Sequence, residues 1–199
     1  MIKKFLRDHS IHKKIVPIFD YIFLLRPTYF FNVWLSFLCG IYVIQFTYYP
    51  ENIWGLNLST NSLILIAGLS IFSGGCFINW QLNSKSNFKL HNKVSLLENC
   101  IKIKIAQKFQ YIFIFIGTLL SFISDFTSII FLFFILLLTT SIFKQKLIEI
   151  KSNNLIVFSI LLFLIGITHN FFNIGKVFNI QLIKNIIPFL LIIIINSII

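Results

Sequence analysis

The stretch that decides the fold reads SLILIAGLSIFSGGCFINWQLNSKSN and runs from Ser62 to Asn87. Its apolar part, Ser62–Leu82, matches the roughly 20 helical residues that cross the hydrocarbon core of a bilayer. The stretch ends in three asparagines, Asn79, Asn83 and Asn87, which are spaced four apart. Because residues four apart share one face of a helix, we expect an asparagine ridge where a transmembrane helix leaves the membrane.

The composition of the whole chain is typical of a membrane protein. Of its 199 residues, 57% are hydrophobic and 12% are charged, 25 are Phe, and the mean hydropathy is +0.89. Soluble domains carry about 25% charged residues, so this chain could not cover a water-facing surface. We therefore expect a single all-α, polytopic membrane domain over residues 1–199.

Six apolar segments predict a bundle of about six transmembrane helices over residues 26–199. They lie near Thr28–Tyr48, Ser62–Leu82, Phe109–Ser124, Thr127–Phe143, Asn154–Phe171 and Phe178–Ile199. The third and fourth segments are short for a span, and the turn SDFT between them must be tight, so they predict a helical hairpin. Residues 1–25 mix apolar and basic side chains, which favours an interfacial amphipathic helix on anionic lipid over a disordered basic tail.

The basic residues predict the orientation. Six precede the first apolar segment, six follow the second, three follow the fourth, and two lie in the last loop. By the positive-inside rule, the N-terminus and the loops 83–108 and 144–153 are expected in the cytoplasm. The formal net charge of +11 therefore reflects the flanks of the spans, and we expect no nucleic-acid partner.

The asparagine ridge resembles a known signature. Its N-x-x-x-N-x-x-x-N pattern is similar to the N-x-x-x-D-x-x-x-D motif that ends the second helix of the UbiA-type intramembrane prenyltransferases. The glycines of the preceding SGG, Ser73–Gly75, allow a close helix neighbour, so we expect the ridge to face inward. Other landmarks fall in the family's order along essentially the whole chain: Arg26 with Pro27, Gly40, Asn92 with Lys93, Ser141, Lys144 and Asn154. The resemblance implies a UbiA-like fold, shortened at the C-terminal end.

The resemblance also implies a chemistry that this sequence lacks residues for. Members of the family are understood to transfer a prenyl group from a polyprenyl diphosphate, with Mg²⁺ held by two Asp-rich motifs. Here Asn83 and Asn87 replace the first pair of carboxylates, no acid occurs from Asn79 to Val94, and the chain ends at Ile199, where the second motif would begin. Hard cations favour charged oxygen ligands, so we expect no metal site, no cofactor and no catalytic residue.

Cations gather around the same region. Lys85, Lys89 and Lys93 are spaced four apart, and neighbouring cytoplasmic segments add further basic groups. The candidates for binding a diphosphate or lipid phosphate without metal are Asn79, Asn83, Asn87, Lys85, Lys89, Lys93, Ser141, Lys144, Lys146 and Arg26. The alternative interpretation is that these lysines only set the topology and contact lipid headgroups.

Two functional hypotheses follow, and the sequence leaves open whether the protein is an enzyme. In the first, the protein has lost metal-dependent prenyl transfer and is an accessory or structural subunit of a membrane complex, or a lipid- or isoprenoid-binding protein. Its partners would be membrane lipids, other integral membrane subunits and an isoprenoid or polyprenyl diphosphate. In the second, it is an active prenyltransferase that binds diphosphate through lysines, or that uses Mg²⁺ with a partner supplying the missing motif. An unrelated small transporter or complex subunit is a third class.

Three polar residues outside this region carry separate expectations. Asn32, inside the first apolar segment, is expected to make a polar contact between helices. Asp125, in the tight turn, is expected to cap a helix. His169, near the end of the fifth segment, is expected to form hydrogen bonds at the membrane interface rather than take part in catalysis.

Overall fold

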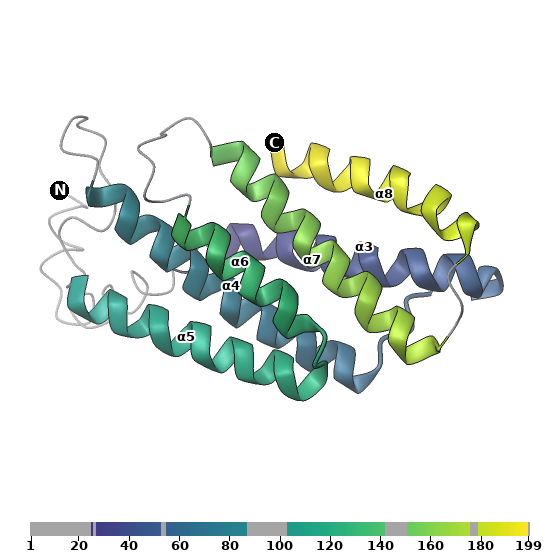
Figure 1. The fold of residues 1–199 in the computed structure, drawn as a ribbon, viewed down its shortest axis with the longest axis horizontal. Helices are drawn as coiled ribbons and strands as arrows, with labels where there is room; N and C mark the ends of the chain where they lie inside the picture. Colours follow the sequence, from purple (N-terminus) through teal and green to yellow (C-terminus); the bar gives the residue numbers. More distant parts are fainter. Residues whose placement is uncertain are drawn as a thin grey trace, which may run out of the picture.

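The computed structural model describes Leu25 and residues 27–52, 55–86, 103–141, 151–175 and 179–198, and every regular element in these ranges is helical (Figure 1). The α-helices are α3 (Phe30–Tyr48), α4 (Thr60–Ser86), α5 (Ile103–Ser124), α6 (Ser128–Ser141), α7 (Lys151–Ile174) and α8 (Ile180–Ile198), with short 3-10 turns at Pro27–Tyr29 and Pro50–Asn52. The all-α prediction is confirmed for the described residues. The expected interfacial segment lies outside them, except for Leu25.

Five of these helices are long and apolar enough to cross a membrane, which identifies a multi-pass helical membrane protein. Their apolar windows are Phe30–Tyr48, Thr60–Trp80, Lys104–Ser124, Leu155–Phe172 and Ile180–Ser197. The sixth helix, α6, covers 14 residues within the described part of the chain, which is shorter than the roughly 20 residues of a full span.

The prediction that the third apolar segment is short is wrong. Helix α5 begins at Ile103 instead of near Phe109 and has 22 residues. Lys104 and Lys108, which the sequence placed in a loop, are exposed residues of its first turns. Lysine can keep its ammonium group in the interface while its stem lies along apolar surface, so these cations do not end the helix.

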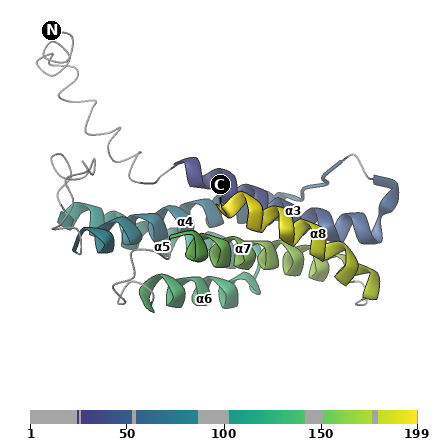
Figure 2. The ribbon, with the colours of Figure 1, turned by 90° about the horizontal axis from the view of Figure 1, so that it is seen from above.

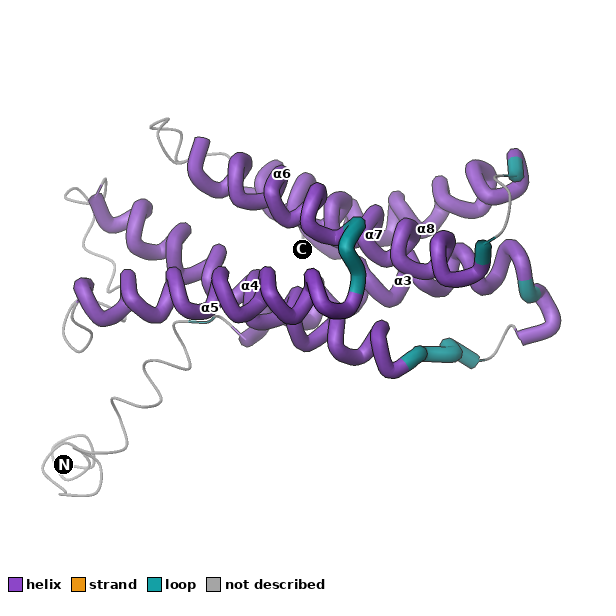
Figure 3. The backbone as a smooth tube through the Cα atoms, turned by 60° about the horizontal axis from the view of Figure 1, so that its bottom comes forward, coloured by secondary structure: helices purple, strands orange, loops and turns teal. Residues whose placement is uncertain are grey.

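The helices pack in two groups, which are joined by α6 and by a direct contact between α3 and α4. In one group, α4 lies along α5 (Figures 1 and 2). In the other group, α3 lies along α7, and α8 packs against α3 and α7. Helix α6 packs on α7 and also contacts α4 and α5. The turn between α5 and α6 is as tight as the sequence predicted, since α5 ends at Ser124 and α6 begins at Ser128 (Figure 3).

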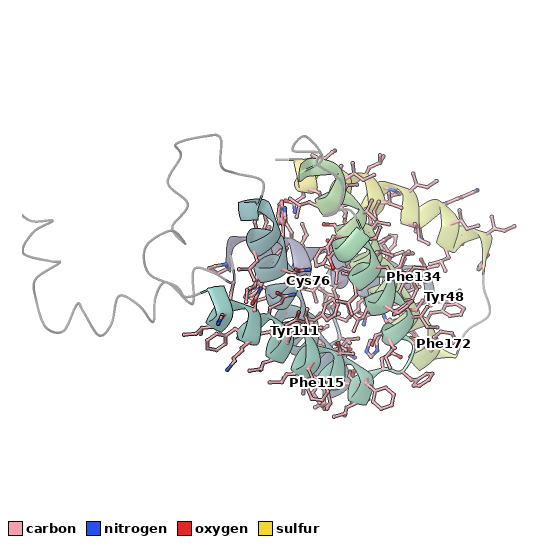
Figure 4. The ribbon with its side chains drawn as sticks, turned by 60° about the vertical axis from the view of Figure 1, so that its left-hand side comes forward. Tyr48, Cys76, Tyr111, Phe115, Phe134 and Phe172 are labelled. Atoms are coloured by element: carbon pink, nitrogen blue, oxygen red, sulfur yellow. The ribbon has the colours of Figure 1, made fainter. Side chains whose placement is uncertain are left out.

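Helix α4 is the central element of the bundle. Its apolar window is 61% buried, against 22% for α5 and 17% for α8. Tyr111 and Phe115 of α5 and Phe134 of α6 point away from the bundle, whereas Cys76 of α4 lies inside it (Figure 4). The outward aromatic and aliphatic side chains fit a hydrocarbon solvent, in which such residues need no protein cover.

Glycines allow the helices of each group to approach closely. A Cβ atom built on Gly75 of α4 would lie 3.0 Å from the backbone nitrogen of Ile114 in α5. At the α3–α7 crossing, Gly166 faces Gly40, and a Cβ on either would overlap a carbonyl oxygen of the opposite helix. Small residues at such crossings permit the van der Waals contact that drives helix association in lipid. The close neighbour expected at the SGG stretch is therefore α5.

Amide side chains attach α8 to α3. The Asn196 Nδ2 group donates to Oδ1 of Asn32 at 2.7 Å, and Nδ2 of Asn185 donates to Oγ1 of Thr47 at 3.0 Å. The predicted interhelical contact of Asn32 is confirmed. These two bonds lie near opposite ends of α8 and so fix its rotation against α3.

Candidate functional site

The asparagine ridge lies at the end of α4. The helix is continuous to Ser86, while its apolar window ends at Trp80, so Asn79 lies at the end of the span and Asn83 lies one turn beyond it. Asn79 is half-buried. Gly75, one turn earlier on the same ridge, packs against Ile114 of α5, so this part of the ridge faces a neighbouring helix, as expected.

The remaining candidates for phosphate binding fall into two sets. Asn83, Lys85 and Ser141 belong to described helices, but their side chains lie outside the description. The candidates that lie wholly outside the described residues are Arg26, Asn87, Lys89, Lys93, Lys144 and Lys146. The expected loops 83–108 and 144–153 are shorter than predicted, because α5 and α7 begin inside them.

The donors of the ridge do not suit the magnesium that the resemblance implies. The amide oxygen of Asn79 is uncharged, and Asn83 continues the ridge with a second amide. Hard divalent cations are held in proteins mainly by carboxylates. Within the described part of the chain, no group of three or more His, Cys, Asp or Glu side chains could hold a metal ion.

A second polar cluster lies at the opposite end of the bundle. Its centre is His169 of α7, whose Nδ1 atom lies 3.3 Å from Oδ2 of Asp125 and whose Nε2 atom lies 3.0 Å from Oγ of Ser62. Asp125 belongs to the α5–α6 turn and Ser62 to the first turn of α4. All three are enclosed, with 3% of the His169 side chain and 12% of the Asp125 side chain exposed.

The hydrogen bonds of this cluster have a defined direction. An ionised carboxylate only accepts, so Nδ1 of His169 carries a hydrogen and donates it to Asp125. In a neutral imidazole Nε2 is then an acceptor, and the Ser62 hydroxyl donates to it. Ser59 Oγ lies 2.9 Å from Ser62 Oγ and accepts the Ser62 backbone N–H at 3.2 Å. The Ser59 hydroxyl therefore donates to Ser62. Each group donates a hydrogen bond to the next, from Ser59 to Ser62, from Ser62 to His169 and from His169 to Asp125.

Asp125 is held in its ionised form. Burial raises the pKa of this carboxyl, but hydrogen bonds from His169 and from the hydroxyl and backbone N–H of Thr127 outweigh burial, so the pKa lies below its ordinary value. The carbonyl oxygen of Asp125 also accepts the backbone N–H and the hydroxyl of Ser128. The expected helix N-cap is not formed by the Asp125 side chain, because the N–H that the carboxylate accepts belongs to Thr127, the residue before α6, and the carboxylate therefore stabilises the turn.

Helix packing places the imidazole. The ring of Phe37 lies 6.2 Å from the His169 ring, and the neighbouring Asn170 donates to the carbonyl oxygen of Ile41 at 3.0 Å. Both contacts come from α3, so they set the rotation of α7 and direct His169 toward α4 and the hairpin turn. The expected hydrogen bonding of His169 is confirmed.

Sequence reasoning weighed His169 and Asp125 separately and did not consider Ser62. One signal was available in the sequence. All three residues are polar and lie near ends of apolar segments that are predicted to be on the side of the membrane with few lysines. In comparisons with known proteins, no family, no curated protein and no solved structure matches this chain. Function is therefore argued from the two polar sites themselves.

Proposed function

We propose that this protein is a UbiA-like membrane protein without metal-dependent prenyl transfer, and that it acts as an accessory subunit that binds an isoprenoid or other lipid phosphate at the asparagine-bearing end. The observation that carries this proposal is the replacement of acids by amides. From Asn79 to Val94 the sequence contains no Asp or Glu, although two carboxylates are implied at Asn83 and Asn87.

The electrostatics of this end favour an anionic ligand over a cation. A Mg²⁺ ion needs negative ligands to replace its tightly held water, and the ridge offers only neutral amide groups. Lys85 lies within the ridge, Lys89 and Lys93 follow it in the sequence, and Lys104 and Lys108 are exposed at the start of α5. Each Lys near a membrane surface contributes about 1 kcal/mol of attraction to anionic lipid, so several lysines together can hold a phosphate group without metal.

The lysines also support an orientation. Fifteen of the 17 Lys and Arg residues precede the first apolar segment or follow the second and the fourth, a distribution that supports a cytoplasmic location for the asparagine-bearing end under the positive-inside rule. The weakly buried helices α5 and α8 would then face lipid or the membrane-spanning helices of a partner complex. An accessory role fits this shape, because a helix that buries only one side is free to contact another subunit.

The direct test is binding of a polyprenyl diphosphate to the protein purified from native membranes. We expect binding that is unchanged by EDTA and is weakened at least about tenfold when Lys85, Lys89 and Lys144 are replaced by Gln. Lys184→Gln, an exposed position on α8 at the other end of the bundle, is the matched control and should bind like the wild type. Copurification with other integral membrane proteins would support the subunit role.

Two results would overturn this proposal. One is a lone purified chain that consumes a polyprenyl diphosphate in the presence of Mg²⁺ and forms a prenylated product. The other is equal diphosphate binding by the triple Gln variant and the wild type, since the lysines would then serve only topology.

A further inference from the structure

We propose that Ser62, His169 and Asp125 form a serine nucleophile site that acts on acyl esters of membrane lipids. This site lies at the end of the bundle opposite the asparagine ridge, so the inference does not depend on the proposed phosphate binding. Its three members come from α4, α7 and the α5–α6 turn, and therefore the arrangement exists only in the folded protein.

The geometry meets the requirements of an activated serine. The hydroxyl must lie within hydrogen-bond reach of a base, and the base must be oriented by a third group. Here the Ser62 Oγ to His169 Nε2 distance is 3.0 Å and the His169 Nδ1 to Asp125 Oδ2 distance is 3.3 Å. The second distance is long for a charge-assisted bond, but such contacts are often loose without substrate.

The direction of the hydrogen bonds is the one that the chemistry needs. Asp125 fixes the hydrogen of His169 on Nδ1, which leaves the Nε2 lone pair facing the Ser62 hydroxyl. Asp125 is kept ionised by the donors around it, as its lowered pKa indicates. Ser62 also lies in the first turn of α4, where the helix dipole favours negative charge that develops on nearby atoms.

The depth of the site indicates the class of substrate. Ser62 is the third residue of the apolar window Thr60–Trp80, Asp125 directly follows the window Lys104–Ser124, and His169 lies three residues before the end of Leu155–Phe172. Each is thus within about one helical turn, roughly 5 Å, of a span end. The layer outside the hydrocarbon core holds the polar headgroup region of the lipids, and ester linkages between acyl chains and headgroups lie at this boundary.

The aromatic side chains beside the site suit an acyl chain. Phe126 is 70% exposed directly after Asp125, and Phe172 is 65% exposed three residues after His169. A lipid acyl chain can lie against such side chains. Because Ser62 is only 5% exposed, side chains around the α5–α6 turn must move to admit the ester group to its hydroxyl. The hydrogen-bonded series also reaches the surface, because its first member, Ser59, is exposed.

The reaction is an acyl transfer in two halves. Ser62 Oγ forms a bond to the ester carbonyl carbon while its proton passes to His169 Nε2. The carbon–oxygen bond to the alcohol then breaks, and the proton moves from Nε2 to the leaving oxygen. Water attacks the acyl-serine in the second half, gives its proton to Nε2, and releases the fatty acid as Ser62 recovers the proton. Asp125 stays ionised and stabilises the imidazolium.

Covalent reactivity of Ser62 distinguishes a nucleophile from a purely structural residue, because a serine that only forms a hydrogen bond between helices is not expected to be nucleophilic. The probe is a long-chain alkyl fluorophosphonate, added to native membranes that contain the full-length protein, with mass spectrometry of the peptides. We expect an adduct on Ser62 in the wild type. We also expect labelling at least about tenfold slower in Asp125→Asn and His169→Gln, because the base is lost or misoriented.

Ser73→Ala is the matched control. Ser73 is a buried serine of the same helix whose hydroxyl donates to the carbonyl oxygen of Leu69 at 2.6 Å, so its removal should leave labelling unchanged. A wild-type protein that carries no adduct on Ser62 overturns the proposal without recourse to any variant. A folded His169→Gln variant that is labelled at the wild-type rate overturns it equally.

Discussion

The α3–α7 crossing predicts a large effect from a single methyl group. A Cβ atom added at Gly166 would overlap the carbonyl oxygen of Phe37, and it would lie 3.1 Å from Cα of Gly40 and 3.2 Å from the nitrogen of Ile41. All three neighbours are backbone atoms of α3, so no side-chain rotation can relieve the overlap. In Gly166→Ala the two helices must therefore move apart.

The size of the effect follows from two opposing terms. Overpacking of this kind costs about 1–3 kcal/mol, whereas alanine is favoured over glycine inside a helix by roughly 1 kcal/mol. Because the clash is with backbone on a helix that is itself packed against α4 and α8, we expect the upper part of the cost. The net loss in the free energy of unfolding is then about 1–2 kcal/mol.

The assay is reversible unfolding in mixed detergent micelles, with the denaturing detergent raised stepwise and helix content followed by circular dichroism. Gly55→Ala is the control, because a Cβ atom there would meet nothing within 4 Å. We expect Gly166→Ala to unfold at a lower fraction of denaturing detergent than both the wild type and Gly55→Ala. Equal or greater stability of Gly166→Ala would refute the close backbone contact between α3 and α7.

Three further changes test other parts of the bundle. The pKa of Asp125 is lower in the folded protein than in the unfolded chain. The carboxylate therefore contributes its full stabilisation at pH values above about 3.9, the pKa of an unperturbed Asp. This stabilisation is lost as the pH falls through the lower pKa of the folded protein. The stability gap between wild type and Asp125→Asn, measured by thermal unfolding in detergent, should close in acid, and a gap that widened would contradict the ionised carboxylate. Ser121 Oγ is buried without a hydrogen-bond partner among the described residues, so Ser121→Ala should leave the melting temperature unchanged or raise it, and a marked fall would reveal a partner. Asn196→Leu removes the hydrogen bond to Asn32 and should lower the free energy of unfolding by about 0.6 kcal/mol. In a double-mutant cycle with Asn32→Leu, fully additive losses of unfolding free energy would show that the bond is not formed.

The helical architecture was predictable because it depends on the length and hydrophobicity of local segments. Runs such as Ser62–Leu82 define spans without knowledge of their partners, and the polar SDFT sequence leaves room only for a short turn. The start of α5 was placed too late, because the exposed lysines Lys104 and Lys108 resemble a loop while their backbone continues the helix. Local pattern does not distinguish a cation in a loop from one on a helix that enters the interface.

The cluster around His169 could not be assembled from the sequence. Ser62 and His169 are 107 residues apart, and Asp125 and His169 are 44 apart. Periodicity tells which residues share a face of one helix but not which faces meet. The glycine crossings that bring α3 to α7 and α4 to α5 decide this pairing, and they depend on three-dimensional fit. The asparagine ridge was accessible because its spacing lies within a single helix.

The tight turn between α5 and α6 has a consequence for how the protein sits in a bilayer. Asp125 directly follows the apolar window Lys104–Ser124, and its lowered pKa keeps it ionised. An ionised carboxylate is costly inside the hydrocarbon core, so this turn must stay in the headgroup layer. A thinner bilayer should therefore be met by a greater tilt of α5 and not by a change in the depth of this turn.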